Sequence, residues 1–260
     1  KIELSKENCD YSFIKKLLIE SSENENTDAM VLYGKLMMKD NHEKGLKHDF
    51  NESFKYFKIA AENDNSEGMA FYSYFLRYGF GVCQFNYIES AKFAKLSCDL
   101  GNMTGASFYS EHLCLGLGVD KDVENAIYYA KLSCDNENSF GMNNYACLLI
   151  DGVGNLKKNR NLAYKYLKMS ADDDNFEGLC NYGTYYIDRF PQNCAETAKY
   201  YKKSMDNGCP FAPRFYGLLF LEGKGVDLDT QKGNQYLKYA ADLGDSYAML
   251  EYSRNLWNGV

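Results

Sequence analysis

Residues 105–134 read GASFYSEHLCLGLGVDKDVENAIYYAKLSC, and the pattern of this stretch recurs along the whole chain. Tyr109 belongs to a series of seven tyrosines whose spacing is 34 to 39 residues. Such a period indicates stacked repeats, because a unit of this size cannot bury its apolar face alone and must pack on its neighbours. The series consists of Tyr33, Tyr72, Tyr109, Tyr145, Tyr182, Tyr216 and Tyr252.

Small residues flank the tyrosine in every unit. In the quoted unit, Ser110 follows the tyrosine directly, Gly105 lies five residues before Ser110, and Leu113 lies three residues after it. These offsets place one apolar stripe on a helix, and the small side chains allow a second helix to approach closely. We therefore expect each tyrosine to pack in the core, with an acceptor for each buried hydroxyl.

A glycine turn ends this first helix in most units. The sequence 116–119, GLGV, is one of four such turns, and glycine adopts the positive φ that stops a helix. No strand precedes these turns and no third glycine follows, so they do not indicate a dinucleotide site. A second helix ends at a small pair such as Ser133-Cys134, and seven residues after this pair's second member the next unit begins. The predicted class is all-α, an αα superhelix (solenoid) of about six to seven two-helix repeats.

The predicted organisation is a single repeat array over residues 1–260. Residues 1–28 are expected to hold the end of a preceding repeat and residues 248–260 a truncated one, which favours a fragment of a longer protein. The complete repeats predicted between them are 29–67, 68–104, 105–140, 141–177, 178–211 and 212–247.

The pattern resembles the Sel-one-like repeat (SLR) family, a branch of the tetratricopeptide-like helical repeats. The likeness covers residues 10–260 and rests on the small residues, the G-x-G-V turn and the closing small pair. The chain departs from the family by Tyr where Leu is usual and by the lack of a double glycine in the first repeat. In the fifth repeat, Arg189-Phe190-Pro191 replaces that turn. We expect distorted loops in these two units.

Composition excludes several classes of function. A net charge of −7 and a pI near 5.1 disfavour a surface that binds nucleic acid. No run of about 18 apolar residues occurs, so no membrane insertion is expected. The nine cysteines form no CxxC pair or zinc-type cluster and cannot all pair, which favours reduced thiols and a cytoplasmic location. The sequence predicts no catalytic residue, cofactor, metal site or small-molecule substrate.

Three groups of residues have both a structural and a functional interpretation. Cys98 and Cys134 occupy the same slot in consecutive repeats, where reduced core thiols are expected. The histidines His42, His48 and His112 are too scattered for a metal site or a triad, and solvated or capping positions are expected. A lysine three residues before the end of each second helix is expected to form a solvated row rather than a docking ridge for an acidic partner. The row is Lys58, Lys95, Lys131, Lys168, Lys202 and Lys238.

The resemblance implies that the first helix of each repeat lines the inner curve of the superhelix. Its exposed inner positions would lie one and four residues after the small residue, or three before it. A protein or peptide partner is expected there, because these positions supply donors, acceptors and aromatic faces to an extended segment. The predicted partner-binding residues of this concave groove are Tyr74, Arg77, Glu111, Asn143, Thr184, Arg214 and Arg254.

The predicted function is a non-catalytic protein–protein interaction scaffold or adaptor within a larger signalling or quality-control protein. One alternative is a regulatory repeat segment of a multidomain enzyme such as a protein kinase. A second is a hydrolase like the β-lactamase-like activity ascribed to a secreted, cysteine-rich subset of the family. That subset follows the cysteine slot with another cysteine eight residues later, where this chain has Ala106 and Met142. This departure counts against the hydrolase.

Overall fold

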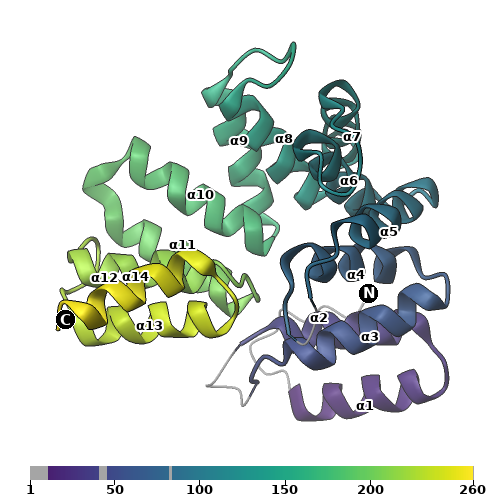
Figure 1. The fold of residues 1–260 in the computed structure, drawn as a ribbon, viewed down its shortest axis with the longest axis horizontal. Coiled ribbons are helices and arrows are strands. Elements are labelled where there is room, and N and C mark those ends of the chain that lie inside the picture. Colours follow the sequence, from purple (N-terminus) through teal and green to yellow (C-terminus); the bar gives the residue numbers. More distant parts are fainter. Residues whose placement is uncertain (1–10, 41–45, 82–83, 260) are drawn as a thin grey trace.

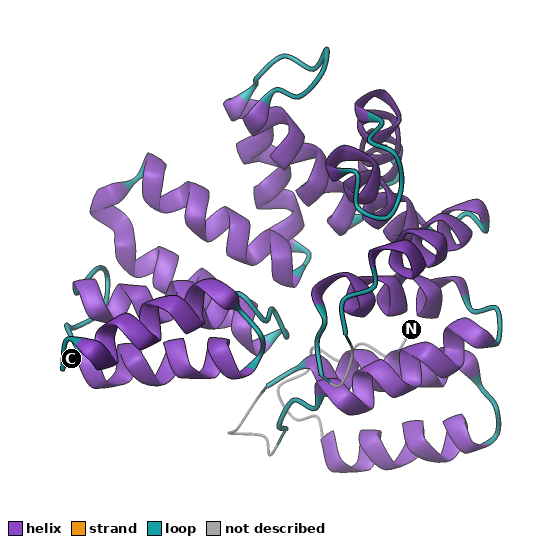
Figure 2. Cartoon of the chain, in the orientation of Figure 1, coloured by secondary structure: helices purple, strands orange, loops and turns teal. Residues whose placement is uncertain are grey.

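The computed structural model describes residues 11–40, 46–81 and 84–259. Within these residues fourteen α-helices and one short 3₁₀ helix follow one another, so the all-α prediction is confirmed (Figure 2). The helices are α1 (Tyr11–Glu23), α2 (Thr27–Met38), α3 (Phe50–Glu62), α4 (Ser66–Tyr78), α5 (Tyr87–Asp99), α6 (Met103–Leu115), α7 (Val123–Asp135), α8 (Ser139–Asp151), α9 (Arg160–Asp172), α10 (Phe176–Arg189), η2 (Pro191–Asn193), α11 (Cys194–Asp206), α12 (Ala212–Glu222), α13 (Thr230–Asp242) and α14 (Ser246–Trp257).

The helices form two-helix units that stack in chain order. Each even-numbered helix from α2 to α12 packs on the odd-numbered helix that follows it. The helices α2, α4, α6 and α8 also pack on the first helix of the next unit. Figure 1 shows the units following one another around a ring, with the first helices toward its inside. The predicted αα superhelix is therefore confirmed.

An asparagine begins the first helix in five of these units. The side chain of Asn102 accepts a hydrogen bond from the Gly105 backbone N–H, 3.0 Å away, which satisfies one of the free donors at the start of α6. Asn138 does the same for α8, and its amide also donates to Thr104 Oγ1 of the preceding first helix at 3.0 Å. The same caps are Asn26, Asn65, Asn102, Asn138 and Asn175.

The small positions identified in the sequence are the points where helices touch. A methyl group added to Gly105 would overlap Ser97 at the end of α5, and Gly141 stands in the same relation to Ser133 of α7. The hydroxyl of Ser133 also donates to the backbone oxygen of Met103 at 2.7 Å. Small side chains at these positions therefore allow the backbones to approach and to exchange hydrogen bonds between neighbouring helices.

In the turn between units, the residue just before each capping asparagine has the left-handed conformation, with a positive φ. Gly101 fills this place before α6 with φ of 80°, whereas Glu137 fills it before α8 with φ of 58°. We expect Glu137→Gly to stabilise the protein by about 0.5–1 kcal/mol, because the left-handed strain of about 1–2 kcal/mol is only partly offset by the greater entropy of glycine in the unfolded chain. Urea denaturation followed by circular dichroism measures the change.

The control for that variant is Lys165→Gly, on the exposed face of α9. Glycine in a helix interior costs about 1 kcal/mol, so this variant should lose stability where Glu137→Gly gains it. A loss of the same size in both variants would contradict the left-handed conformation of Glu137.

Four of the seven repeat tyrosines are buried and three are partly buried. The Tyr72 hydroxyl donates to Glu89 Oε1 at 3.2 Å, and the Tyr182 hydroxyl lies 2.8 Å from that of Tyr164. Tyr33 and Tyr145 bury their rings, but their hydroxyls form no such bond among the described residues. Neither hydroxyl oxygen is enclosed in the protein without a hydrogen-bond partner. Core packing of the tyrosine is therefore confirmed for these four, but the expected acceptor is present in only two of them, because the other two hydroxyls reach solvent.

The fifth unit departs from the others where the sequence predicted it would. Helix α10 continues to Arg189, and the 3₁₀ turn Pro191–Asn193 leads directly into α11 without a glycine turn. The corresponding loop of the first unit includes residues 41–45, so this part of the prediction, like His42, lies outside the described residues.

The inside of the ring is filled by aromatic side chains from four consecutive first helices. The ring of Phe108 lies 6.2 Å from Phe71 and 5.1 Å from Phe140, and Phe140 lies 5.4 Å from Phe176. Tyr74 of α4 then meets Phe176 of α10 at 5.7 Å, which joins units two and five directly. We call Phe71, Tyr74, Phe108, Phe140 and Phe176 the inner aromatic cluster. It shows that the superhelix is curved tightly enough for its own side chains to pack across the ring.

The first unit also contacts the last ones. The Asp40 backbone N–H donates to the Asp206 carbonyl at 3.0 Å, and the Tyr239 hydroxyl lies 3.0 Å from His48 Nδ1. These contacts join residues about 166 and 191 positions apart in the sequence. The ring is therefore closed by polar contacts between its first and last parts, and the accessible part of its concave side is reduced to local cavities.

Candidate functional site

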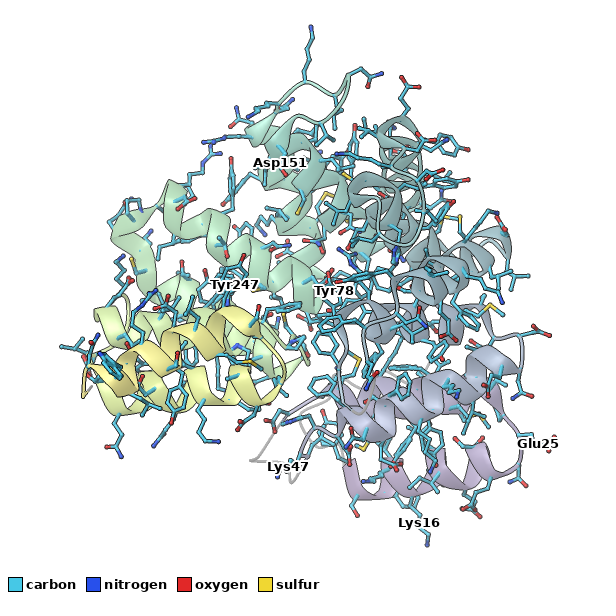
Figure 3. The ribbon with its side chains drawn as sticks, viewed as in Figure 1. Lys16, Glu25, Lys47, Tyr78, Asp151 and Tyr247 are labelled. Carbon is cyan, nitrogen blue, oxygen red and sulfur yellow. The ribbon has the colours of Figure 1, made fainter. Side chains whose placement is uncertain are left out.

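A cavity of about 390 Å³ lies on the concave side, between the C-terminal parts of α4 and α6, helix α8, and the N-terminal parts of α10 and α12. Tyr78 of α4 lies near the middle of the ring (Figure 3) and forms part of its wall. The volume of the cavity lies toward the lower end of the range of about 300–1,000 Å³ that is usual for ligand sites in proteins. The lining residues include Tyr78, Glu111, Asn143, Asn144, Cys147, Glu177, Asn181, Phe211, Arg214 and Phe215.

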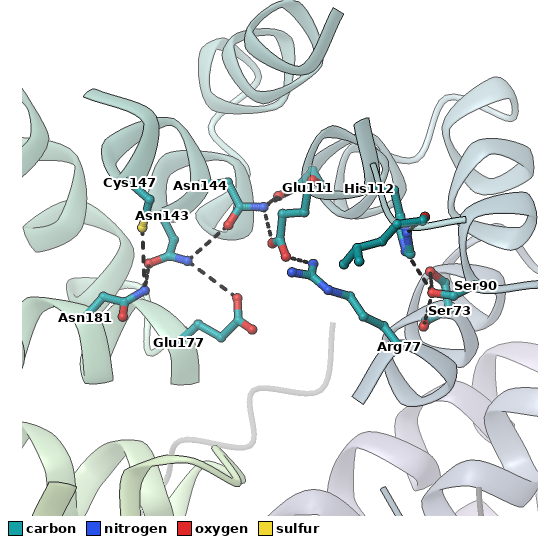
Figure 4. Close-up of polar contacts among 12 residues, drawn as sticks. Ser73, Arg77, Ser90, Glu111, His112, Asn143, Asn144, Cys147, Glu177 and Asn181 are labelled. Atoms are coloured by element: carbon teal, nitrogen blue, oxygen red, sulfur yellow. Dashed lines mark hydrogen bonds and ion pairs between the residues drawn. The ribbon is translucent and has the colours of Figure 1, made fainter. Parts of the chain in front are cut away.

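A row of polar side chains, one carboxylate and three amides, crosses the cavity wall from unit three to unit five (Figure 4). Asn144 donates to Glu111 Oε1 at 2.5 Å and its Oδ1 accepts from the amide of Asn143 at 3.2 Å. Asn181 of α10 donates to Asn143 Oδ1 at 2.9 Å. Because each member is held by its neighbour, the row is a preorganised polar surface formed by α6, α8 and α10.

The Arg77 guanidinium forms an ion pair with Glu111, which joins α4 to this row. Arg77 also lies over the ring of Tyr78, with 4.8 Å between the guanidinium carbon and the ring centroid. Both members of the ion pair are largely buried, with side-chain exposures of 10% and 17%. The two opposite charges of this buried ion pair cancel, so the pair presents little net charge to a ligand.

Glu177 places a second carboxylate in the cavity wall, at the start of α10. The residue is 9% exposed, and Asn143 Nδ2 donates to its Oε2 over a long 3.5 Å. Burial raises the pKa of this carboxyl above its usual value, while the neighbouring Arg77 and Tyr74 lower it. The Tyr74 hydroxyl is buried beside it but makes no hydrogen bond of regular geometry among the described residues. Apart from the adjacent Tyr74 hydroxyl, the Glu177 carboxylate therefore has only the long bond from Asn143.

Two thiols of the cavity wall, those of Cys114 and Cys147, are protonated at neutral pH. Burial raises the pKa of the Cys147 thiol to about 12, and Cys114 is shifted upward by burial as well, so its pKa also lies above the ordinary value. A thiol rather than a thiolate is a weak nucleophile, so these side chains contribute packing and polarisable surface rather than reactivity. All seven cysteines of the described residues are free, including Cys98 and the buried Cys134.

The structure brings together four of the predicted partner-binding residues. Glu111, Asn143 and Arg214 line the cavity, and Arg77 reaches it through Glu111. Arg214 donates to Asp245 Oδ2 at 2.8 Å, so its charge is neutralised by the residue that caps α14. Whether any of these residues binds a partner stays a prediction.

The other three predicted residues lie away from the cavity wall. Thr184 bonds to the Cys180 carbonyl and the Tyr201 hydroxyl at 3.1 and 3.0 Å, and Arg254 is exposed on α14. Tyr74 is only 2% exposed, as is Asn143, so the expectation that these inner positions are exposed is wrong for both. The physical reason is the tight curvature, which packs the Tyr74 ring between Phe108 and Phe176.

Sequence reasoning missed Asn144, Glu177 and Asn181. A signal for two of them was present, because Asn144 and Asn181 lie two residues before the small residue, where other units have apolar side chains such as Phe71 and Phe108. A polar residue at a position that is otherwise apolar indicates a site where the core gives way to a polar surface. Glu177 had no such signal, because its burial results from closure of the ring.

The buried pair Ser90 and His112 has the residue types of a catalytic dyad. Ser90 Oγ lies 2.8 Å from His112 Nε2, and His112 Nδ1 lies 2.7 Å from the Leu117 carbonyl oxygen, which accepts its hydrogen. Both residues are fully buried, so no substrate can reach the hydroxyl. The expectation of a solvated or capping position is therefore wrong for His112, because its ring fills the apolar slot occupied by Phe75 and Leu148 in adjacent units.

The lysine row is neutralised by acidic residues four positions further on. Lys131 lies 2.5 Å from Asp135 and Lys95 lies 2.6 Å from Asp99. Each of the six lysines has such a partner, and the partners are Glu62, Asp99, Asp135, Asp172, Asp206 and Asp242. The row is therefore a series of solvated ion pairs, which agrees with the structural interpretation and gives little attraction for an acidic partner.

We expect Lys131→Ala to change the free energy of unfolding by no more than about 0.5 kcal/mol, because an exposed pair on one helix gains little beyond its solvation. The measurement is urea denaturation at 0.05 and 1 M NaCl, where salt should remove most of the difference from the wild type. The matched variant Asp135→Ala should behave alike. A loss of several kcal/mol would mean that the row supports the fold.

Among the described residues, no group of histidine, cysteine and acidic side chains is placed to hold a metal ion. The same residues contain no helix that is long and apolar enough to cross a membrane. Neither finding identifies a function, and the cavity remains the candidate site.

Comparison with known proteins gives the fold independently. The family model of the Sel1 repeat matches residues 27–65, 66–102, 105–138, 139–175 and 212–245, which is well over half of the chain. The unmatched interval 176–211 contains the unit whose glycine turn is replaced. No curated protein sequence matches the chain significantly.

Several solved structures share the fold at low sequence identity. A protective antigen of uropathogenic Escherichia coli strains that displays an SLR fold is 22% identical with a TM-score of 0.54, and the match covers 96% of this chain but 53% of that one. The chain thus spans about half the length of that relative. A Sel1 repeat protein from Oxalobacter formigenes has 18% identity and a TM-score of 0.55, with coverages of 90% and 97%.

An immunity protein from Pseudomonas aeruginosa is 14% identical with a TM-score of 0.51, over 84% of this chain and 81% of that one. At these identities the likeness concerns the fold alone. Sel1 repeat proteins typically serve as non-catalytic scaffolds for protein interaction. Because the matched repeats span most of the sequence and the helices form the same two-helix units, the chain belongs to the Sel1 repeat family.

Proposed function

We propose that this chain is a non-catalytic interaction scaffold that binds a polypeptide partner at the concave cavity. The main support is the geometry of that cavity, whose polar wall is supplied by helices of several consecutive units rather than by one loop. Such a composite surface is typical of binding by repeat proteins, since it forms only when the units are stacked. We also propose that the chain is located in the cytoplasm and forms part of a larger signalling or quality-control protein.

The size of the cavity changes the expected mode of binding. A volume of about 390 Å³ suits one or two side chains or a tight turn, not a long extended segment. The inner aromatic cluster fills the space that an extended peptide would occupy, because Phe108 and Tyr74 are 2% exposed. We infer that the partner inserts a short protruding element between α8, α10 and α12.

Supporting observations for the two alternative functions are weaker. The fully buried Ser90 and His112 cannot act on a substrate, and the free Cys98 and Cys134 provide no disulfide framework like that of the cysteine-rich subset. A regulatory role within a multidomain enzyme is compatible with the proposed scaffold, because regulation would also require the chain to bind a polypeptide.

The test is a selection of random twelve-residue peptides displayed on phage against the whole chain. Selected peptides are then measured against Asn181→Phe, which fills the cavity wall with the side chain that Phe71 and Phe108 contribute at the same repeat position. The control is Lys165→Phe, which adds the same exposed ring on the outer face of α9.

We expect synthetic copies of the selected peptides to bind the wild type and Lys165→Phe alike and to bind Asn181→Phe at least ten times more weakly. Equal affinity for all three proteins would place the interface elsewhere. Failure to enrich any peptide that binds the wild type would overturn the proposed function.

A further inference from the structure

Charge in the cavity is unevenly balanced. The Arg77 guanidinium is neutralised by Glu111, and Arg214 is neutralised by Asp245, whose carboxylate is buried. Glu177 forms no ion pair with the residues that the structure describes, and neither does Asp151 at the rim of the cavity. The carboxylates of Glu177 in the wall and Asp151 at the rim therefore give the cavity an excess of negative charge.

Glu177 is buried and directed into the cavity. It is 9% exposed, and Figure 4 shows its carboxylate facing the central space with only the long bond from Asn143 drawn to it. A buried carboxylate with one long hydrogen bond and no ion pair is costly, since the protein interior replaces only part of its hydration. The groups that face it from the surrounding helices are Tyr74 and Arg77 of α4 and Asn143 of α8, and Arg77 is already bonded to Glu111.

Two further features suit a long cationic side chain. Asn181 uses its amide hydrogens for Asn143 and Cys147, so among the described residues its carbonyl oxygen has no hydrogen bond and is available as an acceptor at the cavity wall. Phe211 and Phe215 form an apolar part of the same wall. Lysine and arginine combine an apolar stem with a charged head, and they bury the stem against apolar surface while the head meets polar groups.

We propose that the cavity takes one basic side chain, a lysine or an arginine of the bound polypeptide, with Glu177 as the carboxylate that binds its charge. The carbonyl oxygen of Asn181 acts as a second acceptor, and the phenylalanine wall covers the stem. This inference rests on the proposed function, because the side chain belongs to the polypeptide that the scaffold binds. It specifies the chemistry of the partner: a basic residue at the tip of a protruding loop or turn.

The test uses five-residue acetylated and amidated peptides, Ala-Ala-X-Ala-Ala, in which X is lysine, arginine, norleucine or glutamate. Norleucine keeps an apolar stem without the charge. Binding is followed by nuclear magnetic resonance of the side-chain amides of Asn143, Asn144 and Asn181, which report on the cavity wall directly. We expect the lysine or the arginine peptide to bind at least tenfold more tightly than the norleucine peptide.

Glu177→Gln should abolish that tenfold difference, because the amide keeps the shape but not the charge. The matched control is Asp135→Asn, which removes a carboxylate from the outer face of α7 and should leave the difference intact. The comparison of peptides on the wild type does not depend on either variant, so it remains decisive if Glu177→Gln folds poorly. Putrescine is included as a free cation, and it should bind more weakly than the basic peptides.

Several outcomes would overturn the inference. Equal binding of the norleucine and basic peptides, preference for glutamate, or absence of binding at millimolar concentration would each show that the cavity does not select a basic side chain. Putrescine binding as tightly as the peptides would assign the site to a free cation. The peptides selected by phage display decide the proposed function separately, since they can bind the cavity even when the short basic series does not.

Discussion

Gly118→Ala should destabilise the protein by about 3–4 kcal/mol, the largest effect that we expect from a change of one methyl group. Gly118 has φ of 72°, and a methyl group on it would overlap the backbone carbonyl of Tyr87 at the start of α5. The left-handed conformation costs about 1–2 kcal/mol for alanine, and forcing apart two backbones adds about 1–3 kcal/mol. The second glycine of the turn is therefore a contact between successive units as well as a stop signal.

The control for this effect is Gly101→Ala. Gly101 has a similar φ of 80°, but a methyl group there would meet nothing within 4 Å, so only the conformational cost of about 1 kcal/mol is expected. Urea denaturation gives the two changes, and hydrogen exchange in α5 and α6 reports local opening in case the array does not unfold in one step. Equal losses in the two variants would mean that α5 does not pack on the turn.

The arrangement of the repeat could be predicted from the sequence because it depends on local rules. The turn at residues 116–119 supplies the conformations that end a helix, and the small residue at Gly105 marks a helix contact whatever the rest of the chain does. The distorted fifth unit followed from Arg189-Phe190-Pro191 for the same reason. Each of these features is decided within one unit or by its nearest neighbour.

The candidate site could be predicted only in part, because it depends on how far the superhelix curves. A small change in the angle between units accumulates over the array, and no single residue sets it. Here the accumulated curvature brings α4 against α10 and buries Tyr74, which would line an open groove in a wider superhelix. Glu177 is buried for the same reason. Repeat positions therefore place Glu111 on the concave side, but they do not reveal that the Glu177 carboxylate is enclosed there.

Closure of the ring also explains why the concave side offers cavities rather than a continuous groove. The Asp40 backbone is bonded to Asp206, and Tyr239 is bonded to His48, across the gap between first and last units. A partner that inserts a single side chain meets a preformed surface there, which reduces the entropy cost of binding. Under the proposed function, such a scaffold would recognise a protruding feature of its partner, whereas an open superhelix would follow an extended chain.

Acidification from pH 7.5 to pH 5 should remove on the order of 2 kcal/mol of stability through His112 alone. Burial lowers the pKa of His112 from the ordinary value of 6.5 to about 4. The hydrogen bond to the Leu117 carbonyl opposes this shift, and the nearby Arg77 adds to it. Because the folded-state pKa lies below that of the unfolded chain, the unfolded chain takes up the proton first as the pH falls. The stabilisation is therefore complete above about pH 6.5 and is lost between about pH 6.5 and 4.

The measurement compares the wild type with His112→Leu, which places in this slot the residue that Leu148 provides in the next unit. Whatever the difference in their free energies of unfolding at pH 7.5, the wild type should lose about 2 kcal/mol more than the variant by pH 5. The imidazole resonance that disappears in His112→Leu should titrate near pH 4 in the folded wild type. Titration near pH 6.5 would show that water reaches the ring, and the buried pair with Ser90 would then be open to solvent. A midpoint near 4 would instead confirm that the array keeps this hydroxyl and imidazole sealed from solvent.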